Sequence, residues 1–321
     1  MSRLRLGTRG SQLALFQANT TAALLKAHAA IDCEIVVIKT SGDRLSEAPL
    51  SEIGGKRLFV KEIEDSLLAG EIDLAVHSSK DLPAVLPPGL VIGAVLPRED
   101  PRDAVVLPVG RTASSLDAVR DLLGSAPKIG TSSVRRIAQL LRPFPGARFE
   151  PIRGNLDTRL RKLDSGDYDA LVLAAAGLRR LEHAHRISMA LPAELCVPAP
   201  GQGIIAIEVR ENDTRAREVI GSINDSTASA ALDTERAVVT RLGGGCQMPI
   251  GAYASLEGAT ITVAAIVIAL DGSREVRASA AGPADDPATI GIQVADALLA
   301  RGADTILAEA QHVSSHTSEQ P

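Results

Sequence analysis

Short apolar runs alternate with longer segments of helical periodicity over the first two hundred residues. The runs at 3–8, 34–40 and 72–78 predict strands, and the segments at 11–29 and 57–70 between them predict helices. The first of these helical segments begins with a serine, a residue that favours helix N-termini. Strands that alternate with helices are typical of βαβ units, so the pattern predicts an α/β fold with a mainly parallel sheet.

A second series of alternating strands and helices begins near residue 102. Within it, GTSSVRRIAQL (130–140) resembles GTRGSQLALFQ (7–17), because both run from a strand through Gly-Thr and small polar residues into a helix. Each fragment places backbone N–H groups and an arginine beside a helix N-terminus, which is a ready anion site. The repeated pattern predicts two similar α/β lobes that enclose a cleft.

The remaining sequence predicts a smaller third domain. Before it, the Pro- and Gly-rich stretch 191–210 is interpreted as a segment that crosses between domains. Within the third domain, Asp271-Gly272 lies between two strand signals and predicts a hairpin turn. We expect an α+β domain with a three-stranded antiparallel sheet, followed by a disordered tail. The expected division is lobe 1 at 1–101 with 201–221, lobe 2 at 102–200, the C-terminal domain at 222–312 and the tail at 313–321.

Composition narrows the function classes. Aromatic residues make up 2% of the chain and tryptophan is absent, so binding of nucleic acid through base stacking is not expected. The longest apolar run, 263–270, is too short to span a bilayer, and the N-terminus lacks the apolar run of a signal peptide. Three widely spaced cysteines fit a reducing cytoplasm and form no metal-ligand pattern with the six histidines. We expect a cytoplasmic monomer, because no exposed apolar element suggests an interface.

Charge is distributed unevenly along the chain. The net charge is −5, yet eight basic residues and only two acidic ones lie between Lys128 and Arg161. Guanidinium groups bind carboxylate or phosphate through paired hydrogen bonds, so the segment indicates an anion site, although a solvated helix face explains the charge count equally well. Five arginines at comparable strand-to-helix junctions favour a polyanionic ligand. They are Arg9, Arg135, Arg136, Arg153 and Arg159.

The stretch VHSSKDLP (76–83) ends a buried-looking strand, where α/β folds place ligands. Lys80 supplies a cation for an anionic group, and Asp81 supplies a carboxylate for proton transfer or cation stabilisation. The alternative is a strand-end turn with a salt bridge, and His77 is interpreted as a packed strand residue. The polar segment 41–57 is compatible with a lid over the cleft and equally with a surface loop of no function.

Cys246 lies in RLGGGCQMPIG (241–251), directly after three glycines. Three consecutive glycines disfavour helix and strand because their backbone entropy is high, so the cysteine is expected on a loop. The loop is either an ordinary turn or a segment that keeps the sulfur exposed and movable.

Nine short motifs follow one another from about residue 4 to residue 253. They are GTRGSQLALFQA, GGKRLFVKEIE, DLAVHSSKDLP, REDPRDA, IGTSSVRR, IRGNLDTRLRKL, LAAAGLRRL, PAPGQGIIAIE and GGGCQMPIGAYA. Each motif is weak by itself, but in this order they are highly specific. Together they resemble the hydroxymethylbilane synthase family, also called porphobilinogen deaminase, and the C-terminal domain continues the resemblance less specifically to about residue 310.

The resemblance implies a transferase of tetrapyrrole biosynthesis, the route to haem and chlorophyll-type porphyrins. Such an enzyme joins four porphobilinogen molecules head to tail, releases ammonia each time and yields hydroxymethylbilane. The chain grows on a dipyrromethane primer held by a thioether to one cysteine, which by position is Cys246. The implied fold has two lobes like type II periplasmic binding proteins and a small domain that carries the cysteine loop. Each pyrrole brings two carboxylates, which explains an arginine-rich segment in an acidic protein.

The motif matches also imply individual roles. Asp81 is expected to be the catalytic acid–base and to stabilise the cationic azafulvene that forms when porphobilinogen loses ammonia. Lys56 lies in the suspected lid, whereas Glu52 departs from the lysine often found there and weakens the case for a lid contact from that position. The residues expected to bind cofactor and substrate carboxylates are Arg9, Ser11, Ser78, Lys80, Thr131, Ser132, Ser133, Arg135, Arg136, Arg153, Arg159 and Gln202.

Two functions of other classes compete with this interpretation. The first is a cysteine-dependent hydrolase or acyltransferase with Cys246, His77 and Asp81 as a triad, which leaves the arginines unexplained. The second is a non-catalytic binding protein of the two-lobed type, which needs no third domain with an exposed thiol.

Overall fold

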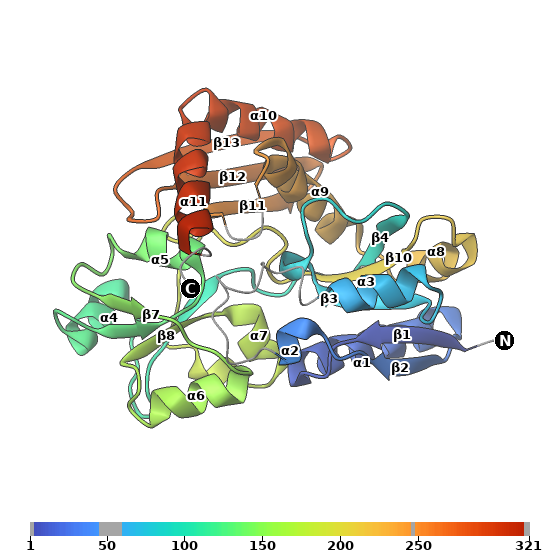
Figure 1. Cartoon of the computed structure of the whole chain (residues 1–321), viewed down its shortest axis with the longest axis horizontal. Coiled ribbons are helices and arrows are strands. Elements are labelled where there is room, and N and C mark those ends of the chain that lie inside the picture. The colour runs from blue at the N-terminus through green and yellow to red at the C-terminus, as the bar shows by residue number, and fades with distance from the viewer. Residues whose placement is uncertain (1–2, 45–59, 245–247, 318–321) are drawn as a thin grey trace.

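The N-terminal lobe is built on a five-stranded sheet with the order β2-β1-β3-β10-β4 (Figure 1). The computed structural model describes residues 3–44, 60–244 and 248–317. The strands of this sheet are β1 (Leu4–Thr8), β2 (Cys33–Val37), β3 (Leu74–Ser78), β4 (Leu90–Val95) and β10 (Ile205–Arg210). β2, β1 and β3 pair in parallel, whereas β10 runs antiparallel to both β3 and β4. All strands except β10 therefore share one direction, which confirms the mainly parallel sheet.

The helices of this lobe cover the apolar strands. They are α1 (Gln12–Ala29), α2 (Ser41–Arg44), α3 (Lys61–Leu68), α8 (Thr214–Gly221) and the 3-10 turn η3 (Ser79–Asp81). α1 begins where the sequence predicted, because the Ser11 hydroxyl accepts a hydrogen bond from the Ala14 amide at 3.3 Å. Leu25 of α1 packs in one buried cluster with Leu6 of β1 and Leu74 of β3. This core fixes the ends of β1 and β3 side by side.

The second lobe repeats this arrangement with the strand order β7-β6-β8-β5-β9. Its strands are β5 (Asp103–Val106), β6 (Lys128–Gly130), β7 (Arg148–Glu150), β8 (Ala170–Ala174) and β9 (Met189–Ala190). Its helices are α4 (Leu116–Leu123), α5 (Val134–Leu140), α6 (Leu156–Asp164), α7 (Ala175–Arg180) and the 3-10 turn η4 (Ala184–Arg186). β5 is the antiparallel strand here, as β10 is in the first lobe. β1 and β6 occupy the same place in their sheets and each leads into a serine-capped helix, which confirms the predicted similarity of the lobes.

The third domain contains the predicted three-stranded antiparallel sheet, in the order β11-β12-β13, and Figure 1 shows it above both lobes. Its elements are β11 (Ile250–Glu257), β12 (Thr260–Ile268), β13 (Glu275–Pro283), α9 (Ser226–Arg241), α10 (Pro287–Leu299) and α11 (Ala303–Thr317). The prediction of a disordered tail from residue 313 is wrong for 313–317, which are helical. Buried Ile306 and Leu307 anchor α11, and adding residues to an existing helix is favourable.

A buried ion pair joins the third domain to the first lobe. Oε1 of Glu235, in α9, accepts a hydrogen bond from Arg98 Nη1 at 2.6 Å, and the Glu235 side chain is fully buried. The same carboxylate accepts from the amides of Gly201 at 2.6 Å and Ala254 at 2.7 Å. Because a buried charge is tolerated only when it is paired and hydrogen-bonded, these contacts hold α9, β11 and the segment after β4 at one point.

The turn between β12 and β13 packs against the second lobe. Gly272 has a φ of 71°, and a Cβ at this position would lie 2.9 Å from the Ala138 carbonyl oxygen in α5. Ala138 shares a small buried cluster with Ile266 of β12. The hairpin predicted from Asp271-Gly272 is confirmed, and its glycine also permits close contact between the third domain and α5.

We predict that Gly272→Ala destabilises the protein more than the matched substitution Gly258→Ala. Gly258, in the turn between β11 and β12, has a φ of 60°, but a Cβ there would meet no atom within 4 Å. Each alanine in the left-handed region lowers the free energy of unfolding by about 1–2 kcal/mol. Gly272→Ala adds overlap with a carbonyl oxygen, so urea unfolding should show a further loss of about 1–3 kcal/mol. Equal losses in the two variants would contradict the packing described for this turn.

Candidate active site

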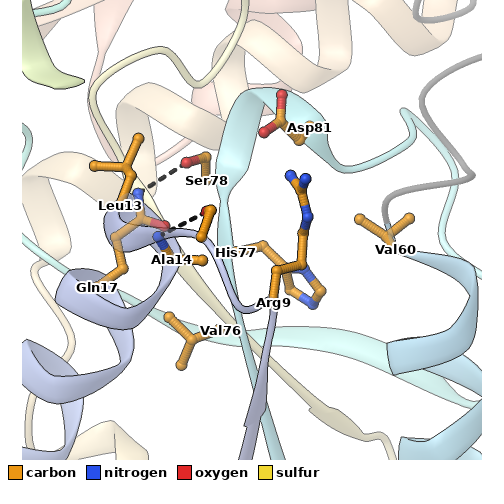
Figure 2. Close-up of a pocket in the computed structure, with 10 residues that line it drawn as sticks. Arg9, Leu13, Ala14, Gln17, Val60, Val76, His77, Ser78 and Asp81 are labelled. Carbon is orange, nitrogen blue, oxygen red and sulfur yellow. Dashed lines mark hydrogen bonds between the residues drawn. The ribbon is translucent and has the colours of Figure 1, made fainter. Parts of the chain in front are cut away.

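A pocket lies in the first lobe where β1 and β3 end and α1 begins (Figure 2). Its lining residues are Arg9, Ser11, Leu13, Ala14, Gln17, Val60, Val76, His77, Ser78 and Asp81. The carboxyl ends of parallel strands are the usual ligand sites of α/β sheets. The structure thus brings four of the residues singled out from the sequence to one place: Arg9, Ser11, Ser78 and Asp81.

Opposite charges face each other in this pocket. Arg9 directly follows β1, Asp81 closes η3 after β3, and the two strands are neighbours in the sheet. Figure 2 shows the Arg9 guanidinium extending toward the Asp81 carboxylate. The N-terminus of α1 adds the positive end of a helix dipole beside them. The pocket is therefore equipped to bind an anionic group and to offer a carboxylate to a developing positive charge.

Buried polar contacts shape the wall of the pocket. His77 Nε2 lies 3.2 Å from Glu208 Oε2 of β10, and these side chains are 3% and 0% exposed. His77 is thus a packed strand residue, as interpreted from the sequence, and it also contributes to the pocket lining. Gln17 Nε2 donates to the Ser78 hydroxyl at 2.8 Å (Figure 2). These contacts hold the strand end that leads to Asp81.

Arginines of the second lobe lie within electrostatic reach of Asp81. Burial lowers the pKa of Arg159, in α6, to about 10, and the positive charges of Arg136 and Arg153 act in the same direction. The negative charge of Asp81 acts in the opposite direction and raises the pKa of Arg159. Because Asp81 belongs to the first lobe, this interaction with Arg159 acts between the two lobes. Guanidinium ions gathered in this way favour a ligand with several negative charges.

The fully buried carboxylate of Asp103, at the start of β5, forms a second cluster. Asp103 Oδ2 accepts from Arg135 Nη1 at 2.7 Å, and Oδ1 accepts from Arg136 Nε at 2.8 Å and Gln202 Nε2 at 2.9 Å. Burial alone would raise the pKa of Asp103, but the two arginine charges outweigh it and hold the pKa far below its usual range. Burial raises the pKa of the Cys196 thiol to about 12, so the thiol stays protonated and donates to Asp103 Oδ2 at 3.3 Å.

Three of the expected ligand-binding residues are thus engaged inside the protein. Arg135 is 3% exposed, Arg136 8% and Gln202 1%, and none of them lines the pocket. The resemblance implied contacts from these residues to ligand carboxylates, whereas the structure places them around Asp103. The physical reason is that a buried carboxylate must be neutralised by cations before any ligand arrives.

The other expected residues lie on the loops around these two clusters. Lys80 Nζ donates to Gln202 Oε1 at 3.3 Å. Ser132 Oγ exchanges hydrogen bonds with the Ile152 backbone, and Ser133 caps α5. Thr131 Oγ1 accepts from the Ser133 amide at 3.4 Å, which makes the Gly-Thr loop self-supporting. Arg153, at the loop before α6, is half-buried.

Several predictions concern residues that the structure does not describe. Cys246 and Lys56 lie outside the described residues, as do Glu52 and most of the suspected lid at 41–57. The described part of that segment, 41–44, is the short helix α2. Among the described residues, no group of three or more His, Cys, Asp or Glu side chains is arranged to hold a metal ion. Nor does any helix in the described ranges have the length and apolar character needed to cross a membrane.

Sequence reasoning missed Asp103 and Gln17. Asp103 stands in the quoted motif REDPRDA, but it precedes an apolar run and gives no sign that it organises two arginines from another helix. Gln17 lies one turn after Leu13 on α1, so its place on the inner face could have been read from the helical period. Only its contact with Ser78 shows why the face matters at this site.

Two family models match this chain, one over the two lobes and one over the third domain. Residues 4–218 match the family model "Porphobilinogen deaminase, dipyromethane cofactor binding domain", and residues 230–300 match "Porphobilinogen deaminase, C-terminal domain". Solved structures similar to this chain include the substrate-binding protein of an amino acid ABC transporter, at 13% identity and a TM-score of 0.37 over 69% of this chain and 91% of that one. Another is the VFT2 domain of BvgS from Bordetella pertussis, at 18% identity and a TM-score of 0.40 over 74% of this chain and 92% of that one.

Curated relatives extend over nearly the whole chain. A porphobilinogen deaminase of Syntrophotalea carbinolica is 46% identical over 96% of this chain and 96% of its own length. Those of Geobacter metallireducens and Brevibacillus brevis are also 46% identical over 96% of this chain, and over 94% and 98% of their own lengths. Similarity of this extent, together with the two family models, shows that the chain belongs to the porphobilinogen deaminase family.

Proposed function

We propose that the pocket between Arg9 and Asp81 is where porphobilinogen loses ammonia during hydroxymethylbilane synthesis, the activity of this family. The observation that carries the proposal is the position of Asp81, which lines the pocket and lies within electrostatic reach of Arg159 in the other lobe. A carboxylate so placed can act on a cationic centre while arginines hold the carboxylates of the same molecule.

Asp81 is suited to the bond-breaking step. When porphobilinogen loses ammonia, the carbon–nitrogen bond breaks and its electron pair leaves with the nitrogen. Positive charge then develops on the pyrrole, and the nearby carboxylate stabilises this charge more in the transition state than in the ground state. Asp81 is also placed to take up and return a proton, which is general acid–base catalysis.

The arginines supply the binding energy for the acidic side chains of the pyrroles. Porphobilinogen carries an acetate and a propionate, and guanidinium binds a carboxylate through two parallel hydrogen bonds. We assign this role to Arg9 at the pocket and to Arg153 and Arg159 at the edge of the second lobe. Ser11, Ser78 and the Thr131–Ser133 loop would add hydroxyl and backbone donors.

The same residues fit the dipyrromethane cofactor of the family. Its two rings carry four carboxylates. Burial, and then the nearby charges of Arg136 and Arg153, lower the pKa of Arg159, and bound anions would relieve this repulsion. When bound, the cofactor supplies the primer to which the pyrrole units are added. We assign its thioether to Cys246, and Lys56 to a lid over the pocket.

The attachment is tested by the mass of the intact protein. We predict that the purified enzyme weighs more than its sequence by two linked pyrrole units and gives a colour with an acidic aldehyde reagent. Cys246→Ser should abolish both signals, because serine forms no thioether. Cys33→Ser, which replaces a half-buried cysteine of β2, is the control and should retain both. A bare mass and a titratable thiol at Cys246 in active enzyme would overturn the attachment.

Asp81→Ala tests the catalytic assignment. We expect the variant to fold and to release ammonia from porphobilinogen about 10²–10³ times more slowly, since it loses a preorganised charge. Asp117→Ala, which removes a largely exposed carboxylate of α4, should leave turnover unchanged. Circular dichroism of both variants checks the fold. Turnover near the wild-type rate in Asp81→Ala would remove Asp81 from the mechanism.

We also propose that the enzyme acts as a cytoplasmic monomer. The large exposed apolar side chains among the described residues are scattered along the chain, such as Phe16 in α1, Val85 before β4 and Val109 after β5. Sedimentation equilibrium at assay concentrations should give the mass of one chain, and cell fractionation should recover the activity with the cytoplasm. A dimer mass would contradict the monomer, and activity in another fraction would contradict the cytoplasmic location.

A further inference from the structure

We propose that Gln202, in the segment that returns from the second lobe to the first, is a positioning residue that holds Lys80 in place. The proposal rests on the function proposed above and on the carboxylate-binding role that the resemblance implied for Lys80. Gln202 Oε1 accepts from Lys80 Nζ at 3.3 Å, while Gln202 Nε2 donates to Asp103 Oδ1 at 2.9 Å. One amide thus links the lysine beside Asp81 with the carboxylate that neutralises Arg135 and Arg136.

The orientation of this amide is set by its surroundings. Gln202 Nε2 also donates to the Pro101 carbonyl at 2.7 Å, so two acceptors surround the nitrogen end. Only the NH₂ group of a glutamine can face two acceptors, which leaves Oε1 for Lys80. With 1% of Gln202 exposed, water cannot substitute for these partners at low cost.

The backbone at this position is held as firmly as the side chain. Gly201 has a φ of 72° and a Cβ there would lie 2.5 Å from Ser79 Oγ, next to Lys80. Gly203 has a φ of 90° and a Cβ there would lie 2.3 Å from the Glu99 carbonyl oxygen. The two glycines therefore let Gln202 sit between η3 and the segment that crosses to the second lobe.

This geometry gives Gln202 a different role from the one implied by the resemblance. The side chain is buried among protein groups, so it acts on the ligand through Lys80. Loss of the amide would remove one of the contacts that fix the ammonium group of Lys80, and ligand binding would then have to restrict its rotamers further. The expected consequence is weaker binding of porphobilinogen with little change in the chemical step.

The test compares Gln202→Met with the matched control Gln139→Met. Gln139 is also a buried glutamine, 4% exposed, with bonds to the Val197 backbone, but it has no hydrogen bond to Lys80. Purified enzymes are acetylated briefly with an amine reagent, and Lys80 is quantified by peptide mass spectrometry against Lys26. We expect Lys80 labelling and KM for porphobilinogen to rise about fivefold in Gln202→Met, with kcat within about twofold, and neither to change in Gln139→Met.

The possible results separate this proposal from the function on which it rests. Unchanged Lys80 labelling in Gln202→Met, or an equal rise in Gln139→Met, would overturn the positioning role. Increased labelling with unchanged KM would overturn the assignment of Lys80 to carboxylate binding, and with it the present proposal. If Gln202→Met does not fold, Gln202→Asn keeps an amide that is one methylene too short for Lys80, and the same increases are expected.

Discussion

The neutralisation of one buried carboxylate, Asp103, is the constraint on which the rest of the structure depends. A charge at this depth is tolerated only when cations and donors surround it, and here Arg135, Arg136 and Gln202 do so at 2.7–2.9 Å. Asp103 stands where the chain crosses into the second lobe, and Gln202 stands where it returns. Both crossings and the arginine helix α5 are therefore held by a single set of charges.

The third domain is held by a second buried charge of the same kind. Glu235 ties α9 to Arg98 and to the Gly201 amide, one residue before Gln202. On its other side, the turn at Gly272 rests against α5. The domain expected to carry the cofactor therefore contacts both the crossing segments and the arginine helix. Such contacts would fix the position of a cofactor attached to this domain relative to the two lobes.

The pocket uses charge differently from these clusters. Asp103 and Glu235 accept hydrogen bonds from several internal partners, whereas Arg159 lies near the cations Arg136 and Arg153 and within electrostatic reach of Asp81 in the other lobe. The interior clusters neutralise buried carboxylates within the protein, whereas guanidinium groups that lie close to one another, as around Arg159, are suited to a polyanionic ligand.

Local sequence determined the elements of this protein, and tertiary structure decided which side chains act together. Ser11 and the Asp271-Gly272 pair could be placed in advance because caps and turns depend on a few neighbouring residues. The likeness of the two lobes could be anticipated for the same reason, from one strand-to-helix junction that occurs twice. The antiparallel pairing of β10 with β3 and the ion pair between Asp103 and Arg135 each join segments that lie tens of residues apart in the chain. No local sequence pattern encodes such contacts. Arginine spacing indicated an anion site, but only burial and hydrogen bonding distinguished Arg135 and Arg136, which neutralise Asp103, from Arg153 and Arg159.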